Sequence, residues 1–153
     1  MSIPASRLNR SWRFGDPWSI ADATELYEIA RWGQGYFSIG GDGHVHVHPA
    51  KEPQNSIDLK SLTDDLILRG IDLPILIRFT DILKHRLQDI HDAFQAAIAQ
   101  HGYQGRYACV YPVKVNQQRR VVEEVVKYGR PFGFGLEAGS KPELLAVAAL
   151  ASN

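Results

Sequence analysis

The chain has 153 residues, 44% of them hydrophobic, so it is long enough to bury a core of its own. Its 17 basic residues balance its 17 acidic residues, which leaves no overall field to attract nucleic acid or an anionic membrane surface. No apolar run is long enough to span a bilayer, the first residues lack the apolar core of a secretory signal, and the single cysteine, Cys109, excludes an internal disulfide, so we expect a cytoplasmic protein.

Residues 1–72 are expected to form an N-terminal segment of short helices and a β-hairpin. The run Asp22–Glu25 resembles a capping box at the start of one short helix. Ser61 is expected to cap a second helix, over Leu62–Arg69, which Gly70 ends.

The hairpin is predicted from two strand-like runs, Tyr36–Ile39 and His44–His48, around the glycine turn Gly40–Gly43. Alternate residues of a strand point to the same side, so the three histidines of the second run share one face and could hold a metal ion. A row of like rings on an exposed hairpin face is the simpler interpretation, and no metal ligand is predicted. The histidines in question are His44, His46 and His48.

Residues 73–153 are expected to form three strand–helix units in succession. Apolar runs of strand length alternate with longer segments whose apolar residues recur every three or four positions. This repeat predicts parallel strands joined by right-handed crossovers. The expected strands are Leu73–Phe79, Tyr107–Val115 and Phe132–Glu137; the expected helices cover Thr80–His101, Val121–Gly129 and the residues after Ser140, with Thr80 and Ser140 as caps.

Two α/β architectures fit this order, a closed (β/α) barrel and an open doubly wound sheet. A dinucleotide-binding sheet carries a GxGxxG turn after its first strand, and the run Gly133–Gly135 has only two of those glycines. The absence of that turn favours a barrel. A whole barrel takes about 250 residues, so we expect this chain to be the opening part of a longer protein.

Lys114 and Glu137 lie at the expected C-terminal ends of successive strands, where α/β proteins build their active sites. A lysine beside a buried strand is costly, because a desolvated ammonium loses its hydration. The same environment is useful when the amine must be neutral and act as a nucleophile. The sequence therefore predicts a catalytic lysine at position 114.

The run Val110–Glu124 resembles the pyridoxal-phosphate lysine segment of the biosynthetic arginine decarboxylases. Gly135–Leu144 and Leu73–Leu83 resemble flanking segments of the same enzymes, and the similarity extends from about Trp12 to Asn153. The Val-Lys-x-Asn core also occurs in ornithine and diaminopimelate decarboxylases. The Gln-Gln-Arg extension that follows it points to the arginine enzymes.

The resemblance implies the N-terminal portion of a fold type III enzyme, an alanine-racemase-like barrel that binds pyridoxal 5'-phosphate (PLP), with a β-domain to which the N-terminal strands contribute. It implies a lyase of polyamine and spermidine biosynthesis that converts L-arginine to agmatine and carbon dioxide, requires magnesium (Mg2+) and is a homo-oligomer. It identifies Lys114 as the lysine that forms a Schiff base with the cofactor. Glu137 and Asn116 match positions near the cofactor.

An alternative stays open, in which the chain is a noncatalytic, truncated relative that acts as a binding or regulatory module. The glycine-rich phosphate site, the ring-stacking residue and the acid facing the pyridine nitrogen belong to later strands of the family's barrel. We therefore expect these 153 residues alone to be inactive. The presence of Lys114 favours the enzyme, because a binding module needs no such amine.

Overall fold

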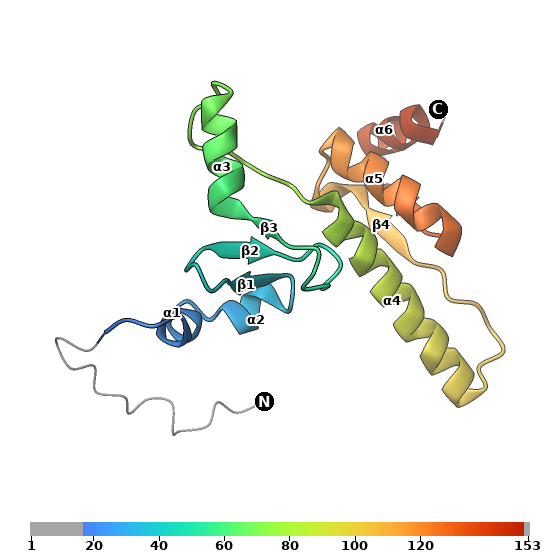
Figure 1. The fold of residues 1–153 in the computed structure, drawn as a ribbon. Helices are drawn as coiled ribbons and strands as arrows, with labels where there is room; N and C mark the ends of the chain where they lie inside the picture. Colours follow the sequence, from blue (N-terminus) through green and yellow to red (C-terminus); the bar gives the residue numbers. More distant parts are fainter. Residues whose placement is uncertain (1–16, 152–153) are drawn as a thin grey trace.

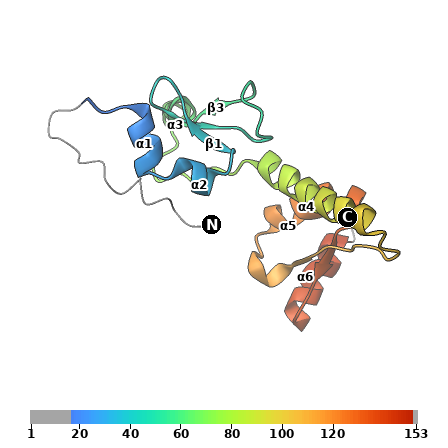
Figure 2. The same ribbon diagram turned by 90° about the horizontal axis from the view of Figure 1, so that it is seen from below.

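A computed structural model describes residues 17–151, so Trp12 and Asn153, the ends of the expected similarity, lie outside the described residues. The chain folds into two halves that meet at the start of one long helix, α4 (Figure 1). In the view from below, α4 leads away from the first half toward α5 and α6 (Figure 2). Helices and small sheets occur in both halves, which confirms the predicted mixed α/β class.

The first half contains a three-stranded antiparallel sheet with the strand order β1-β2-β3. The predicted hairpin is confirmed, since Phe37 pairs with Val47 and Ile39 pairs with Val45 across the glycine turn. The third strand was not predicted, because two residues carry no readable alternation. The elements are α1 (Ile20–Leu26), α2 (Ile29–Gly33), β1 (Phe37–Ile39), β2 (Val45–Val47), β3 (Ile57–Asp58) and α3 (Leu59–Leu68).

Two helices of this half begin earlier than predicted. Ser19 caps α1 and forms a capping box with Asp22: the Ser19 Oγ accepts from the Asp22 N–H at 3.2 Å, and Asp22 Oδ2 accepts from the Ser19 N–H at 3.0 Å. Asp58 caps α3 in place of Ser61, because its carboxylate accepts from the backbone N–H groups of Lys60 and Ser61. In both helices, the residue that caps the helix lies three residues before the polar residue predicted from the sequence.

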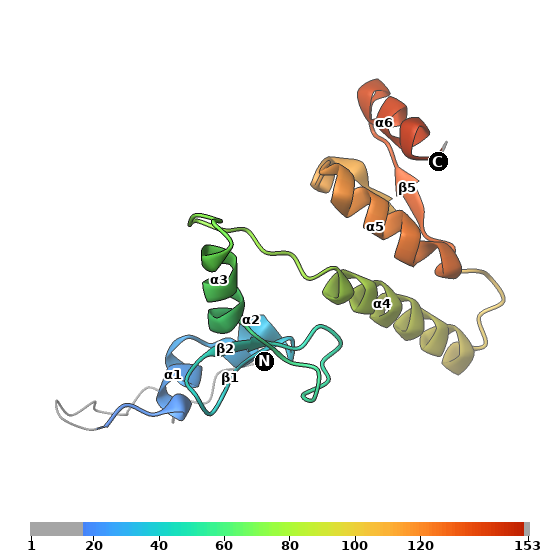
Figure 3. The same ribbon diagram turned by 45° about the horizontal axis from the view of Figure 1, so that its top comes forward.

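The second half contains a parallel pair of strands, β4 and β5, with α5 crossing from one to the other. In Figure 3, β5 leads from the end of α5 toward α6. The strands, helices and two short 3₁₀ helices are α4 (Thr80–His101), β4 (Val110–Pro112), η2 (Val113–Val115), α5 (Arg119–Gly129), η3 (Arg130–Phe132), β5 (Gly135–Glu137) and α6 (Lys141–Ala151).

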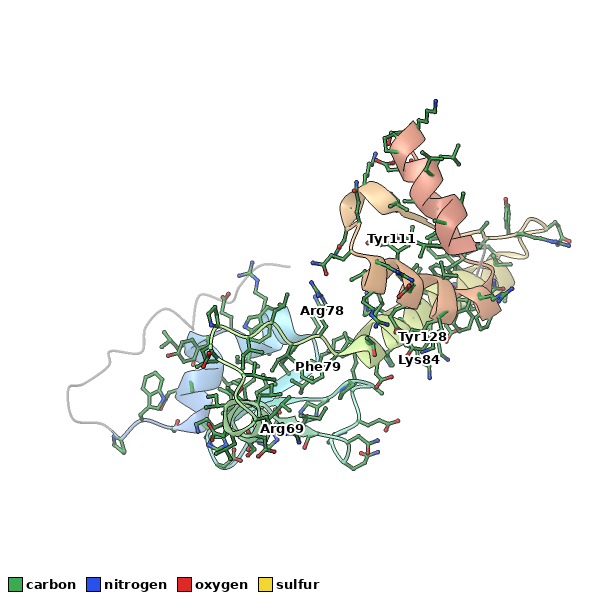
Figure 4. The ribbon with its side chains drawn as sticks, turned by 90° about the horizontal axis from the view of Figure 1, so that it is seen from above. Arg69, Arg78, Phe79, Lys84, Tyr111 and Tyr128 are labelled. Carbon is green, nitrogen blue, oxygen red and sulfur yellow. The ribbon has the colours of Figure 1, made fainter. Side chains whose placement is uncertain are left out.

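The predicted first strand of this half, Leu73–Phe79, does not form. The segment is extended backbone that links the two halves, and within residues 17–151 no strand pairs with it. Figure 4 places Arg78 and Phe79 in this link. An apolar run becomes a strand only when a neighbour accepts its hydrogen bonds, and sequence pattern cannot supply that neighbour. With β4 and β5 as the parallel pair, the described residues contain no closed barrel.

The α4 helix has the predicted bounds, but Thr80 is its first helical residue instead of its cap. Phe79 occupies the cap position and offers no side-chain hydrogen bond. At the other end Gly102 adopts φ +59°, a left-handed conformation that stops the helix at little steric cost.

Polar contacts attach the start of α4 to the first half. The Tyr36 hydroxyl lies 2.7 Å from His85 Nδ1, and Lys51 Nζ lies 3.7 Å from Asp89 Oδ2. The Lys51 ammonium also lies 4.7 Å from the centre of the Tyr36 ring. These groups hold the two halves together across otherwise separate cores.

Each half has a small core. In the first, Val47 is fully buried and Ile29 is 4% exposed. In the second, the apolar face predicted for α5 is confirmed, since Val122 and Val125 are each 1% exposed and α5 packs against α4. Lys84 of α4 reaches over the Tyr128 ring of α5 at 5.8 Å (Figure 4). Between residues 17 and 151, no helix combines the length and apolar character needed to cross a bilayer.

Candidate functional site

The C-terminal ends of β4 and β5 lie at the same edge of the parallel pair. In the register of the two strands, Pro112 pairs with Glu137. Lys114 follows Pro112 by two residues and Glu137 is the last residue of β5. The expectation that these two positions occupy the same strand-end region is therefore consistent with the register.

The lysine itself does not lie on a strand. β4 ends at Pro112, which has no N–H to donate to a longer ladder, and the chain turns into the 3₁₀ helix η2. Val113 is 3% exposed and anchors the turn, whereas Val115 is 70% exposed. The predicted strand Tyr107–Val115 is thus too long at both ends, and Lys114 is carried by a turn after it.

The side chain of Lys114 is exposed, so the expected desolvation is wrong for the described residues. Across residues 17–151 its amine has neither a hydrogen bond nor an ion pair. Because no carboxylate within these residues pairs with the amine, an incoming ligand can reach it. Only a covering segment or a ligand would remove it from water.

Asn116 orders the turn that carries the lysine. Its side-chain oxygen accepts from the Gln118 N–H at 3.0 Å, immediately before α5 begins. Its backbone oxygen accepts from the Tyr111 hydroxyl at 3.2 Å, which ties the turn back to β4. Tyr111 lies on this strand in Figure 4. Together these bonds fix both sides of Lys114.

Glu137 is half-buried and leads into the start of α6. The predicted helix start is present: Ser140 Oγ accepts from the Glu143 N–H at 3.4 Å. The Glu143 carboxylate accepts from the Gly139 N–H at 2.7 Å, whereas in a capping box it would accept from the N–H of the cap residue, Ser140. A Cβ at Gly139 would lie 3.5 Å from Glu137 Oε1, so the loop passes close to this carboxylate.

A cavity of about 550 Å³ lies beside the strand ends, between the turn η2, the first turn of α5 and the side of α6, along which its lining extends as far as Leu150. Lys114 and Glu137 are not among its lining residues, although Val113 and Gln117 flank the lysine in the chain. Its polar lining was not predicted as a site. Its polar lining residues could have been predicted as a site, because they lie just before or within the first helical turn that follows each strand end. They are Gln117, Arg119, Ser140 and Glu143.

The three histidines of the hairpin contact different partners. His44 Nδ1 lies 2.8 Å from Asp58 Oδ2, and His46 Nε2 lies 3.2 Å from Asp42 Oδ2. His48 Nε2 instead lies 2.7 Å from the Ser38 hydroxyl. Their alternating positions along the strand therefore do not bring the three histidines together as one set of metal ligands.

Comparison with known proteins gives a consistent result. A protein of Rhodopirellula baltica named biosynthetic arginine decarboxylase is 54% identical over 133 residues, which cover 87% of this chain and 20% of that protein. A Gloeobacter violaceus protein of the same name is 54% identical over 132 residues, 86% of this chain and 20% of its own length. A protein of the same name from Geotalea daltonii is 47% identical over 135 residues, which cover 88% of this chain and 21% of that protein.

No family model matches the chain. The chain spans about a fifth of the length of the curated relatives it matches, since the aligned residues cover 20 to 21% of each. An identity near one half over most of the chain establishes common descent. Over the part that the alignments cover, the chain is therefore homologous to proteins named biosynthetic arginine decarboxylase, as the resemblance of its lysine segment predicted.

Proposed function

We propose that this chain supplies the cofactor-binding lysine of an enzyme that converts L-arginine to agmatine and carbon dioxide with PLP. The observation that carries the proposal is the exposed amine of Lys114 on the turn that follows β4, at the same edge as Glu137. The names of the relatives support the reaction.

The residues present fit the cofactor at the position of the lysine. Covalent attachment of an aldehyde needs an accessible amine on an ordered turn. Lys114 is exposed, and two hydrogen bonds of Asn116 order the turn that carries it. A cavity of about 550 Å³ adjoins the turn, within the range usual for ligand sites. When bound, PLP supplies the electron sink that stabilises the carbanion left by the departing carboxylate.

Within this assignment each residue has its own task. The amine of Lys114 binds the cofactor and, once released, can hold or move a proton. Asn116 keeps the lysine turn in register with the start of α5. The Glu137 carboxylate lies at the neighbouring strand end and would orient the cofactor.

The remaining properties of the whole protein belong to the same proposal. They are an alanine-racemase-like barrel whose first units are residues 73–153, a β-domain that includes residues 1–72, a magnesium requirement, a homo-oligomeric state and a cytoplasmic location. The 153 residues by themselves are expected to be inactive, because Lys114 is exposed and nothing in the described part encloses its amine.

Borohydride trapping tests the lysine directly. The whole protein is loaded with PLP, reduced with borohydride, digested, and its peptides are analysed by mass spectrometry. We expect the cofactor mass on the peptide that contains Lys114 and no such mass on Lys141, an exposed lysine that follows the other strand end. Stoichiometric modification of another lysine in place of Lys114 would reject the proposal.

A further inference from the structure

A second group of chemically active side chains lies in the first half, between the hairpin turn and the start of α3. One ligand atom from each of Asp42, His46 and Asp58 lies within 4.8 Å of the other two. His44 adjoins them, with its Nδ1 2.8 Å from Asp58 Oδ2 and 3.7 Å from Asp42 Oδ2. Two imidazoles and two carboxylates thus converge from the turn, β2 and β3.

The ligand atoms of Asp42, His46 and Asp58, all within 4.8 Å of one another, are close enough for one ion to draw together. Ligands at about 2.0 to 2.1 Å from a tetrahedral zinc ion lie about 3.3 Å from one another. The distances from Asp42 Oδ2 to His46 Nε2 and to His44 Nδ1 are 3.2 and 3.7 Å. The first distance is close to the tetrahedral value, and the second exceeds it by about 0.4 Å.

The backbone leaves room for the group at Gly40. A Cβ built at this glycine would lie 2.5 Å from His46 Nε2 and 2.6 Å from Asp42 Oδ1. Any larger residue at position 40 would therefore displace the two side chains. This close approach is independent of the contacts within the cluster.

Outer contacts already orient several of the ligands. His46 Nδ1 lies 3.5 Å from the Ser56 hydroxyl, which leaves Nε2 directed toward Asp42. The Ser61 hydroxyl and two backbone N–H groups donate to Asp58.

We propose that Asp42, His44, His46 and Asp58 bind one zinc ion, or a similar divalent transition metal, that ties the hairpin turn to the start of α3. His44 becomes the fourth ligand when its ring turns toward the ion: its Nδ1 and Asp58 Oδ2, which contact each other at 2.8 Å, both bind the ion, and the proton between them is released to solvent. Two imidazole nitrogens suit zinc, whereas magnesium prefers an octahedral shell of oxygen atoms. This site is thus separate from the cofactor lysine and from any magnesium requirement. His48 is outside the group because its Nε2 contacts Ser38.

Zinc and cobalt titrations of the chelator-treated protein test the site. We expect one bound zinc per chain, displaceable cobalt with the visible absorption of four-coordinate Co2+, and no displacement by Mg2+. His46→Ala should weaken zinc binding by at least about ten-fold, and Asp42→Asn, which keeps the amide oxygen that accepts from the His44 N–H, should do the same. His48→Ala is the matched control, because it removes the histidine that directly follows β2 and contacts Ser38, and it should leave binding unchanged.

Thermal unfolding gives a second readout that does not depend on enzyme activity. Zinc binds the folded state only, so it should raise the Tm of the protein and of His48→Ala but not of His46→Ala or Asp42→Asn. Circular dichroism verifies that each variant is folded; Asp42 lies in an exposed turn and is the variant expected to fold without difficulty. The inference is overturned if the protein takes up no zinc, or if both ligand variants bind zinc as tightly as His48→Ala.

Discussion

Replacing Lys114 with alanine in the whole protein should lower the rate of agmatine formation by at least about a thousand-fold, because a covalently acting amine has no substitute nearby. Within the described residues no other lysine lies on the turn after β4. The visible absorption of bound PLP should shift or disappear with the activity. Agmatine release and the absorption spectrum are measured on the same preparation.

Lys141→Ala is the matched control for this experiment. Lys141 is also exposed and also follows a strand end, as the first residue of α6, so its removal changes the charge by the same amount. We expect near-normal activity. If Lys114→Ala retains turnover comparable to Lys141→Ala, the assignment of the cofactor to position 114 is wrong.

Leu87→Ala should produce the largest loss of stability. Leu87 is 6% exposed and is the buried residue of α4, the helix that packs on α5 and contacts the first half. Truncation of a buried leucine to alanine costs about 2 to 5 kcal/mol, a large part of the roughly 5 to 15 kcal/mol that stabilises an ordinary domain. Urea unfolding followed by circular dichroism measures the change in the free energy of unfolding.

Leu68→Ala makes the same chemical change at a solvent-facing position. Leu68 ends α3 and is 85% exposed, so the expected change is within about 0.5 kcal/mol. Equal losses of free energy in the two variants would show that α4 does not form the packed element described above.

Local features of the fold could be predicted because their causes are local. The hairpin depends on a glycine turn between two short runs, and α5 depends on valines spaced to form one face, of which Val122 and Val125 are buried. Helix starts were misplaced where two polar residues compete, as Asp58 and Ser61 do at α3. The sequence does not show whether the Asp58 carboxylate or the Ser61 hydroxyl accepts from the free N–H groups at the start of the helix.

Features that depend on distant partners could not be predicted. The run Leu73–Phe79 has the composition of a strand but lies beside none. Lys114 was found from its position after an apolar run, yet its exposure depends on what covers the strand ends. Asp58 joins the hairpin histidines only through β3, a strand of two residues that gives no signal of its own.

The extended link between the halves has a practical consequence. Arg78 is exposed on a backbone that is neither helical nor paired, which is the conformation that a trypsin-like protease binds in its cleft. Brief digestion should therefore cut after Arg78 before it cuts within α4 or α5. Among the described residues, the Tyr36–His85 and Lys51–Asp89 contacts would then help to hold the two products together, and their separation by salt would measure how strongly those contacts join them.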